Sequence, residues 1–126
     1  MKFIVLRDNY SILKFTNGEV LPDWIYTSEF YSITKTVDEI SVVTTQTHLD
    51  PDTNISSKDW RIFKIIGPLD LSSIGIISEI SAILKNADIS IFTISTFETD
   101  YILVKQADLQ RGVSALNEYG HFVMYE

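Results

Sequence analysis

Residues 60–105 read WRIFKIIGPLDLSSIGIISEISAILKNADISIFTISTFETDYILVK, and this stretch decides the fold. Its first seven residues, 60–66, are mostly β-branched or aromatic, which predicts a strand. The strand should stop at Pro68, because proline cannot donate a hydrogen bond to a sheet. Over residues 74–86 the apolar side chains recur at intervals of three and four, so this segment is predicted to be an amphipathic helix.

The remaining elements complete a known arrangement. Residues 89–96 and 101–105 are two apolar strands joined by a short acidic turn, which predicts an antiparallel hairpin. A second helix is expected over residues 107–118, followed by a last strand at 121–125. The order β-α-β-β-α-β is that of the ferredoxin-like fold, in which right-handed crossovers place both helices on one face of the sheet.

The N-terminal half resembles a shortened copy of this pattern. FYSITKTVDEISVVTT (30–45) matches SIFTISTFETDYILVK (90–105) as strand, threonine, acidic turn and strand. A strand is also expected at 10–15 and a short helix at 22–26, whereas the polar residues 47–59 indicate a loop or linker. We therefore expect an α/β (α+β) two-layer protein with a shortened βαββ unit and linker at 1–59 and a complete βαββαβ unit at 60–126.

Both faces of the predicted sheet are apolar. Ile62 and Phe63 are neighbours in one strand, and so are Ile91 and Phe92 in another, although neighbouring strand residues point to opposite faces. A sheet with one face in water would alternate more cleanly. The face without helices is therefore expected to pack on the N-terminal half, on a partner subunit, or on both, and a homodimer is predicted.

Composition limits the classes of function. The 126 residues have a net charge of −7 and no cysteine. An acidic surface repels phosphate backbones and anionic lipids, so neither nucleic acid nor a membrane surface is an expected partner. No segment approaches the roughly 20 apolar residues of a spanning helix, and the N-terminal apolar run is too short for a secretory signal. A cytoplasmic protein is predicted.

Motifs for catalysis and cofactors are missing from the sequence. It has no glycine-rich phosphate loop and no nucleophile elbow. The two histidines, His48 and His121, lack the spacing of a zinc site, and we expect both on the surface. The sequence therefore predicts a protein that is not an enzyme and has no cofactor and no metal.

Two segments form a candidate binding site. GPLDLSSIG (67–75) leads into the first helix, where the backbone N–H groups of Ser73, Ile74 and Gly75 suit an anion such as an α-carboxylate. TFETD (96–100) is a hairpin turn with two carboxylates, Glu98 and Asp100, that suit a cation. Together they suit a zwitterion. The alternative is purely structural: the serines cap the helix, and the acidic residues solvate a turn.

These segments are where the chain resembles a family. Residues 60–105 resemble the ACT domain, specifically the tandem ACT type of small bacterial proteins and of the CASTOR arginine sensors. The features that match are the GPLD loop, the helix start at Gly75, the strand ADISIFTIST and the hairpin STFETDYILV. FYSITKTVDEISVV also looks like the N-terminal half of this family.

The resemblance implies a regulatory domain that binds a small ligand, usually an amino acid, at an interface between two ACT units. In the sensors, ligand groups meet the loop before the first helix and the hairpin turn. The corresponding ligand-binding residues in this chain are Asp70, Ser72, Ser73, Ile74, Gly75, Thr96, Phe97 and Asp100. The backbone carbonyls of Thr96 and Phe97 would meet a basic side chain. Where the sensors carry an acidic residue, this chain has Ser78, a departure that speaks against arginine.

The function expected from the sequence is a non-catalytic, allosteric regulatory module that binds a small ligand, an amino acid, at an ACT–ACT interface. No output domain accompanies it, so any signal would pass to a separate regulated protein. The alternative is a protein–protein interaction or dimerisation module without a small-molecule ligand, whose apolar sheet face docks on an enzyme or on itself.

Overall fold

The computed structural model describes residues 1–48, 56–67 and 74–126. These residues form eight β-strands, two α-helices and three short 3-10 helices. Contacts divide the chain into two compact units. One unit consists of Met1–Arg7 together with Arg61–Glu126, and the other is the intervening segment Asp8–Trp60.

The discontinuous unit has the predicted ferredoxin-like order with one strand added. Its elements are β1 (Lys2–Val5), β5 (Ser56–Ile65), α1 (Ile76–Asn86), β6 (Phe92–Ser95), β7 (Asp100–Lys105), α2 (Leu109–Glu118) and β8 (Phe122–Tyr125). The strands lie in the order β6–β7–β5–β1–β8. The predicted α+β fold class, with its ferredoxin-like architecture, is confirmed.

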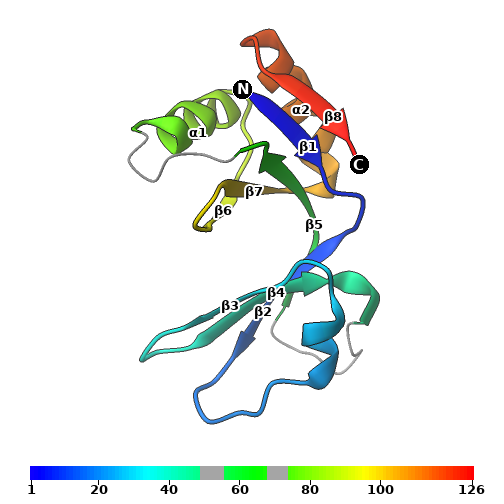
Figure 1. Ribbon diagram of the computed structural model, residues 1–126, viewed down its shortest axis with the longest axis vertical. Helices are drawn as coiled ribbons and strands as arrows, with labels where there is room; N and C mark the ends of the chain where they lie inside the picture. The colour runs from blue at the N-terminus through cyan, green and yellow to red at the C-terminus, as the bar shows by residue number, and fades with distance from the viewer. Residues whose placement is uncertain (49–55, 68–73) are drawn as a thin grey trace. The chain divides into compact units, whose positions relative to one another are not determined.

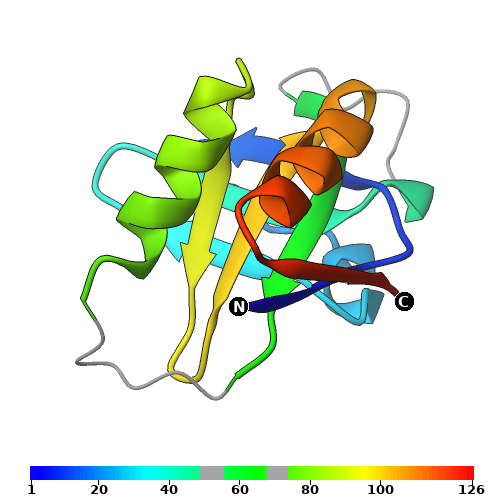
Figure 2. The ribbon, with the colours of Figure 1, turned by 90° about the horizontal axis from the view of Figure 1, so that it is seen from above.

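Both helices cover the same face of this sheet (Figures 1 and 2). Alternate strand residues point to that face, so Phe63, Ile102 and Val104 join one core. The helices contribute residues such as Leu84 and Leu116, which are both fully buried. The helical periodicity of the sequence therefore corresponds to a real buried stripe on each helix.

The first strand is the main feature that the sequence did not reveal. We expected residues 1–7 to belong with the N-terminal unit 1–59, but contacts place Met1–Arg7 in the C-terminal unit. Strand β1 lies between β5 and β8, with Phe3 opposite Ile65 in an antiparallel pair. It is parallel to β8, where Lys2 is opposite Phe122. Phe3 is fully buried, so the strand is part of the core.

The other unit contains β2 (Tyr10–Phe15), β3 (Ser32–Lys35), β4 (Ile40–Thr45) and two 3-10 helices, η1 (Asp23–Thr27) and η2 (Gln46–His48). The first residues of β5 complete its sheet, in the order β3–β4–β2–β5. A small core joins the sheet to η1, with Ile25 fully buried beside Leu13 and Val42.

Residues 56–59, predicted as part of the linker, are the start of β5 instead. They are polar, but β2 supplies hydrogen-bonding partners for their backbone, since Leu13 pairs with Ser56 and Ile12 with Ser57. Backbone pairing, rather than the side-chain pattern, makes this segment a strand. The rest of the expected linker, at 49–55, lies outside the described residues.

The two hairpins of the chain are built alike. In the β3–β4 hairpin Ser32 pairs with Val43. In the β6–β7 hairpin Phe92 pairs with Leu103, so each partner is shifted by 60 residues. The 3-10 helices that follow, η2 and η3 (Gln106–Asp108), show the same shift. The internal similarity between residues 30–45 and 90–105 is therefore a structural repeat.

Candidate functional site

An open cavity of about 500 Å³ lies beside the β6–β7 hairpin in the discontinuous unit. Strands β1, β5 and β7 supply its floor through Ile4, Lys64 and Tyr101. The hairpin turn, residues 96–99, forms one wall, and Ile66 and Gly67 border it at the end of β5. Its size is within the usual range for small-molecule sites.

The floor belongs to the sheet face that does not carry the helices. Phe63 and Ile65 point to the helical core, so Lys64 between them points to the opposite face. There the Lys64 ammonium lies 5.9 Å from the centroid of the Tyr101 ring, within cation–π distance. The contact places a positive charge over an aromatic surface at the base of the cavity.

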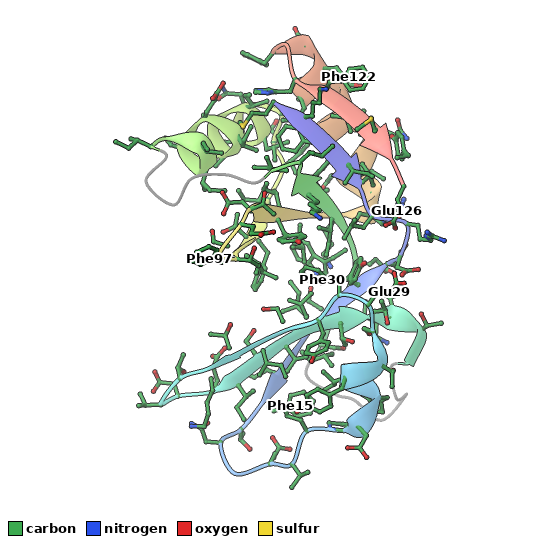
Figure 3. The ribbon with its side chains drawn as sticks, in the orientation of Figure 1. Phe15, Glu29, Phe30, Phe97, Phe122 and Glu126 are labelled. Carbon is green, nitrogen blue, oxygen red and sulfur yellow. The ribbon has the colours of Figure 1, made fainter. Side chains whose placement is uncertain are left out.

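The hairpin wall is held in place by threonines. The Thr96 backbone N–H donates to the Thr99 carbonyl at 2.9 Å. The buried Thr99 hydroxyl donates to the Ile65 carbonyl at 2.6 Å, which fixes the hairpin to β5. Phe97 and Glu98 are left at the tip, with the Phe97 side chain 79% exposed (Figure 3).

The cavity combines opposite charges with apolar surface. Lys64 offers an ammonium group and Glu98 a carboxylate, each able to make a charge-assisted hydrogen bond. Ile4, Ile66 and Phe97 add apolar contact area. Such a lining suits a small zwitterion that also has a less polar part.

The structure brings only some of the predicted residues to this cavity. Thr96 and Phe97 line it, whereas Ile74, Gly75 and Asp100 are not among its lining residues. The other three predicted residues lie outside the described part of the chain: Asp70, Ser72 and Ser73.

Gly75 is explained by backbone conformation. It is the N-cap of α1 with a φ of 82°, in the left-handed region that favours glycine. Among the described residues no side chain caps the helix start, and the neighbouring Ile74 is 97% exposed. A ligand-binding role for the backbone N–H groups at this helix start stays a prediction.

Asp100 points to the helical face of the sheet, since it alternates with Ile102 and Val104 of the core. Its carboxylate accepts a hydrogen bond from the Ser95 hydroxyl. Asp100 and the cavity floor at Tyr101 therefore lie on opposite faces of β7. Its predicted contact with a basic ligand group stays a prediction.

Four lining residues belong to neither segment proposed from the sequence: Ile4, Lys64, Ile66 and Tyr101. Ile4 lies on the strand that the sequence analysis did not recognise. Lys64 did offer a signal, because it lies between two apolar residues of a strand and so points to the face opposite Phe63 and Ile65. That alternation identifies its face, but only the fold brings it to the hairpin.

The matching hairpin of the other unit shows what its carbonyl groups can bind. The Asn17 side-chain amide donates to the Thr36 carbonyl at 3.1 Å and to the Val37 carbonyl at 2.8 Å. Thr36 and Val37 are the counterparts of Thr96 and Phe97 in the 60-residue repeat. Two successive carbonyls at this turn can therefore converge on one nitrogen.

The second histidine differs from expectation. His121 was predicted on the surface, which is wrong, because it is only 8% exposed. Its Nδ1 lies 2.7 Å from the Met1 amino group, and its Nε2 lies 3.5 Å from Glu79 Oε1.

The described residues contain no group of three or more acidic, histidine or cysteine side chains that could hold a metal ion. No helix within the described ranges is long and apolar enough to span a membrane.

Known structures share this fold over nearly the whole chain. A protein from Agobacterium tumefaciens is 32% identical, with a TM-score of 0.91, over 99% of this chain and 92% of that one. The regulatory subunit of aspartate kinase from Thermus thermophilus is 9% identical, with a TM-score of 0.63, over 90% of this chain and 93% of that one. Aspartate kinase from Clostridium acetobutylicum is 16% identical, with a TM-score of 0.66, over 89% of this chain but 33% of the enzyme.

Family comparison agrees with the two-part organisation. A family described as an N-terminal domain matches residues 8–52, within the inserted unit Asp8–Trp60. The ACT domain matches residues 55–118, which is half of the 126-residue chain and includes both helices and the β6–β7 hairpin. The chain therefore belongs to the ACT-domain family.

Proposed function

We propose that this protein is a non-catalytic regulatory module that binds a free amino acid in the cavity beside the β6–β7 hairpin. The observation that carries the proposal is the pairing of opposite charges, Lys64 and Glu98, around one cavity of about 500 Å³. A free amino acid has an α-carboxylate for the first group and an α-ammonium for the second. Membership of the ACT-domain family supports a regulatory ligand-binding role.

The hairpin wall supplies the third recognition element. The Thr96 and Phe97 carbonyls correspond to the two carbonyls that accept the Asn17 amide in the other unit. Within the described part of the chain, no hydrogen bond to either carbonyl is found. We infer that a donor on the ligand side chain binds there.

The family resemblance also suggests that a second ACT-like unit closes the site. That second surface would come from the other half of the chain or from a partner copy in a homodimer. Regulation then requires the ligand to prefer one of two arrangements, because it can shift an equilibrium only by its difference in affinity. Micromolar binding, about 8 kcal/mol, leaves room for a coupling of about 1–3 kcal/mol to a separate regulated protein.

Isothermal titration of the full chain with each of the twenty amino acids tests the proposal. We expect saturable binding of a subset of them, and loss of that binding in Glu98→Gln. The matched control is Glu118→Gln, at the C-terminal end of α2 and distant in sequence from the cavity residues. No heat with any of the twenty would overturn the proposal and favour the interaction module without a ligand.

A further inference from the structure

We propose that the ligand is a free amino acid whose side chain ends in a primary carboxamide, as in glutamine or asparagine. We also propose that Asn17 is the chain's own substitute for that group in the N-terminal unit. The inference rests on the proposed function and narrows it to one chemical class. It begins from the two hydrogen bonds of the Asn17 side chain.

The Asn17 amide shows which donor fits this turn. A primary amide nitrogen carries two N–H groups in one plane. At the β3–β4 hairpin the Asn17 nitrogen reaches both the Thr36 and the Val37 carbonyl, at 3.1 and 2.8 Å. The turn there is closed by the Thr36 N–H donating to the Glu39 carbonyl at 2.9 Å. At the β6–β7 hairpin Thr96 and Thr99 make the same bond at the same length.

Gly67 occupies the place in its unit that Asn17 occupies in the other. Asn17 lies two residues after the end of β2 at Phe15, and Gly67 lies two residues after the end of β5 at Ile65. In both units the strand lies next to the second strand of the hairpin. In the discontinuous unit the Thr99–Ile65 hydrogen bond holds the end of β5 beside the hairpin turn. Glycine has no side chain to donate, and Gly67 borders the cavity instead.

The charged residues of the cavity have counterparts as well. Lys64 lies one residue before the end of β5, as Lys14 does in β2. Lys14 pairs with Ser41, and Ser41 is the counterpart of Tyr101 in the repeat. Glu98 at one hairpin tip corresponds to Asp38 at the other. The two units thus share a lysine, an acidic residue and a hairpin turn at corresponding positions. They differ in that only the N-terminal unit has a side-chain carboxamide, that of Asn17, bound to the turn.

A guanidinium or ammonium side chain held at the two carbonyls would need a carboxylate nearby to balance its charge, whereas a carboxamide would not. Among the described residues near this end of the unit, two other carboxylates are engaged elsewhere. Asp100 accepts from Ser95 on the opposite sheet face, and Glu79 lies 3.5 Å from His121. Glu98 lines the cavity, and it is assigned to the α-ammonium. A side-chain carboxylate would instead place its oxygens against two carbonyl oxygens, leaving those acceptors without a donor.

Titration of the full wild-type chain with glutamine, asparagine, glutamate, aspartate, lysine and arginine tests the ligand class. We expect one of the two carboxamides to bind about tenfold or more tightly than its matched acid, and more tightly than either basic amino acid. Tighter binding of lysine or arginine would overturn the carboxamide assignment and leave the proposed function standing. No binding of any amino acid would overturn both.

Two substitutions at Gly67 test the equivalence with Asn17. Gly67→Asn is expected to supply the donor internally and to abolish binding of the preferred amino acid. Gly67→Ala adds only a methyl group and is expected to retain more of that binding. Circular dichroism and thermal melting establish that both variants are folded. Equal affinity of the two folded variants would overturn the equivalence.

Removing the built-in amide should open the N-terminal hairpin. In Asn17→Ala we expect a second equivalent of the preferred amino acid to bind per chain, with faster hydrogen exchange in the β3–β4 turn before ligand is added. Asn117→Ala, on α2, is the matched control and should keep one equivalent. Unchanged stoichiometry and unchanged exchange in Asn17→Ala would overturn the role assigned to Asn17.

Discussion

The Lys64 ammonium lies 5.9 Å from the centroid of the Tyr101 ring, and both side chains line the same cavity. The two residues come from adjacent strands, β5 and β7. An ammonium held over an aromatic face loses part of its freedom before any ligand arrives, which lowers the entropy cost of binding an anion. We therefore expect recognition of the ligand carboxylate to depend on Lys64.

Lys64→Met is expected to weaken binding of the preferred amino acid by about ten- to a hundredfold, since a charge-assisted hydrogen bond contributes about 1.5–3 kcal/mol. Methionine preserves much of the unbranched stem, so the fold should be retained. The measurement is isothermal titration, with Lys85→Met in the last turn of α1 as the matched control. Equal affinity of Lys64→Met and wild type would show that the carboxylate binds elsewhere.

Gly75→Ala is expected to lower the free energy of unfolding by about 1–2 kcal/mol, because a residue with a Cβ is disfavoured at a φ of 82°. A Cβ there would meet no atom of the described residues within 4 Å, so the expected loss is assigned to backbone conformation. Urea unfolding monitored by circular dichroism gives the value. Ser78→Ala, on the exposed surface of α1, is the control and should be neutral or slightly stabilising. Unchanged stability of Gly75→Ala would contradict the conformational reason for this glycine.

Glu126 gives the chain a local dependence on pH. Its carboxylate accepts from the Arg7 backbone N–H at 3.0 Å and from Arg7 Nε at 3.3 Å. The backbone hydrogen bond is the larger cause, and the two together hold the pKa of Glu126 below its ordinary value. Because the pKa is lowered in the folded state, the stabilisation is complete above the unfolded pKa and is lost as pH falls through the folded one.

Wild type should therefore be more stable than Glu126→Gln near neutral pH, by less than about 1 kcal/mol because solvent screens the pair. The difference should vanish in strong acid, where Glu126 is protonated, and it should shrink with added salt. Urea titrations across the acid range measure it. A difference that persisted at the lowest pH would rule out the charge of Glu126 as its origin.

A homodimer remains our expectation from the apolar character of both sheet faces. Sedimentation at high protein concentration should give a species of twice the 14.4 kDa chain mass. If the ligand prefers the associated form, the preferred amino acid should shift the distribution towards it. A clean monomer at high concentration, with and without amino acid, would contradict this prediction.

The local parts of the fold could be predicted from the sequence. The β6–β7 hairpin and both helices depend on nearby residues, so their patterns are complete within short windows. Strand β1 could not be recognised in the same way. Its four residues, Lys2–Val5, are stabilised by β5 and by β8, whose partner for Lys2 is Phe122. Nothing within a short window reports a contact at that separation.

The candidate site divides along the same line. Thr96 and Phe97 belong to a local turn and were anticipated, and both line the cavity. Lys64 and Ile4 come from separate strands that only the assembled sheet brings to the hairpin. For Asp100 the sequence indicated a position beside the turn but not the face to which the side chain points. That face follows from the alternation along β7, which places Asp100 on the side of Ile102 and Val104.

The placement of β1 bears on how this protein is made. Strand β1 precedes the inserted unit and is parallel to β8, which follows it, so the sheet of the discontinuous unit cannot close until β8 has been synthesised. The inserted unit Asp8–Trp60 has internal contacts of its own. It can therefore become ordered before the discontinuous unit around it is complete. Pairings between such distant parts of a chain are slow to form. Until the β1–β8 pairing forms, β1 lacks one neighbour, and the growing chain exposes an unpaired strand edge to its surroundings.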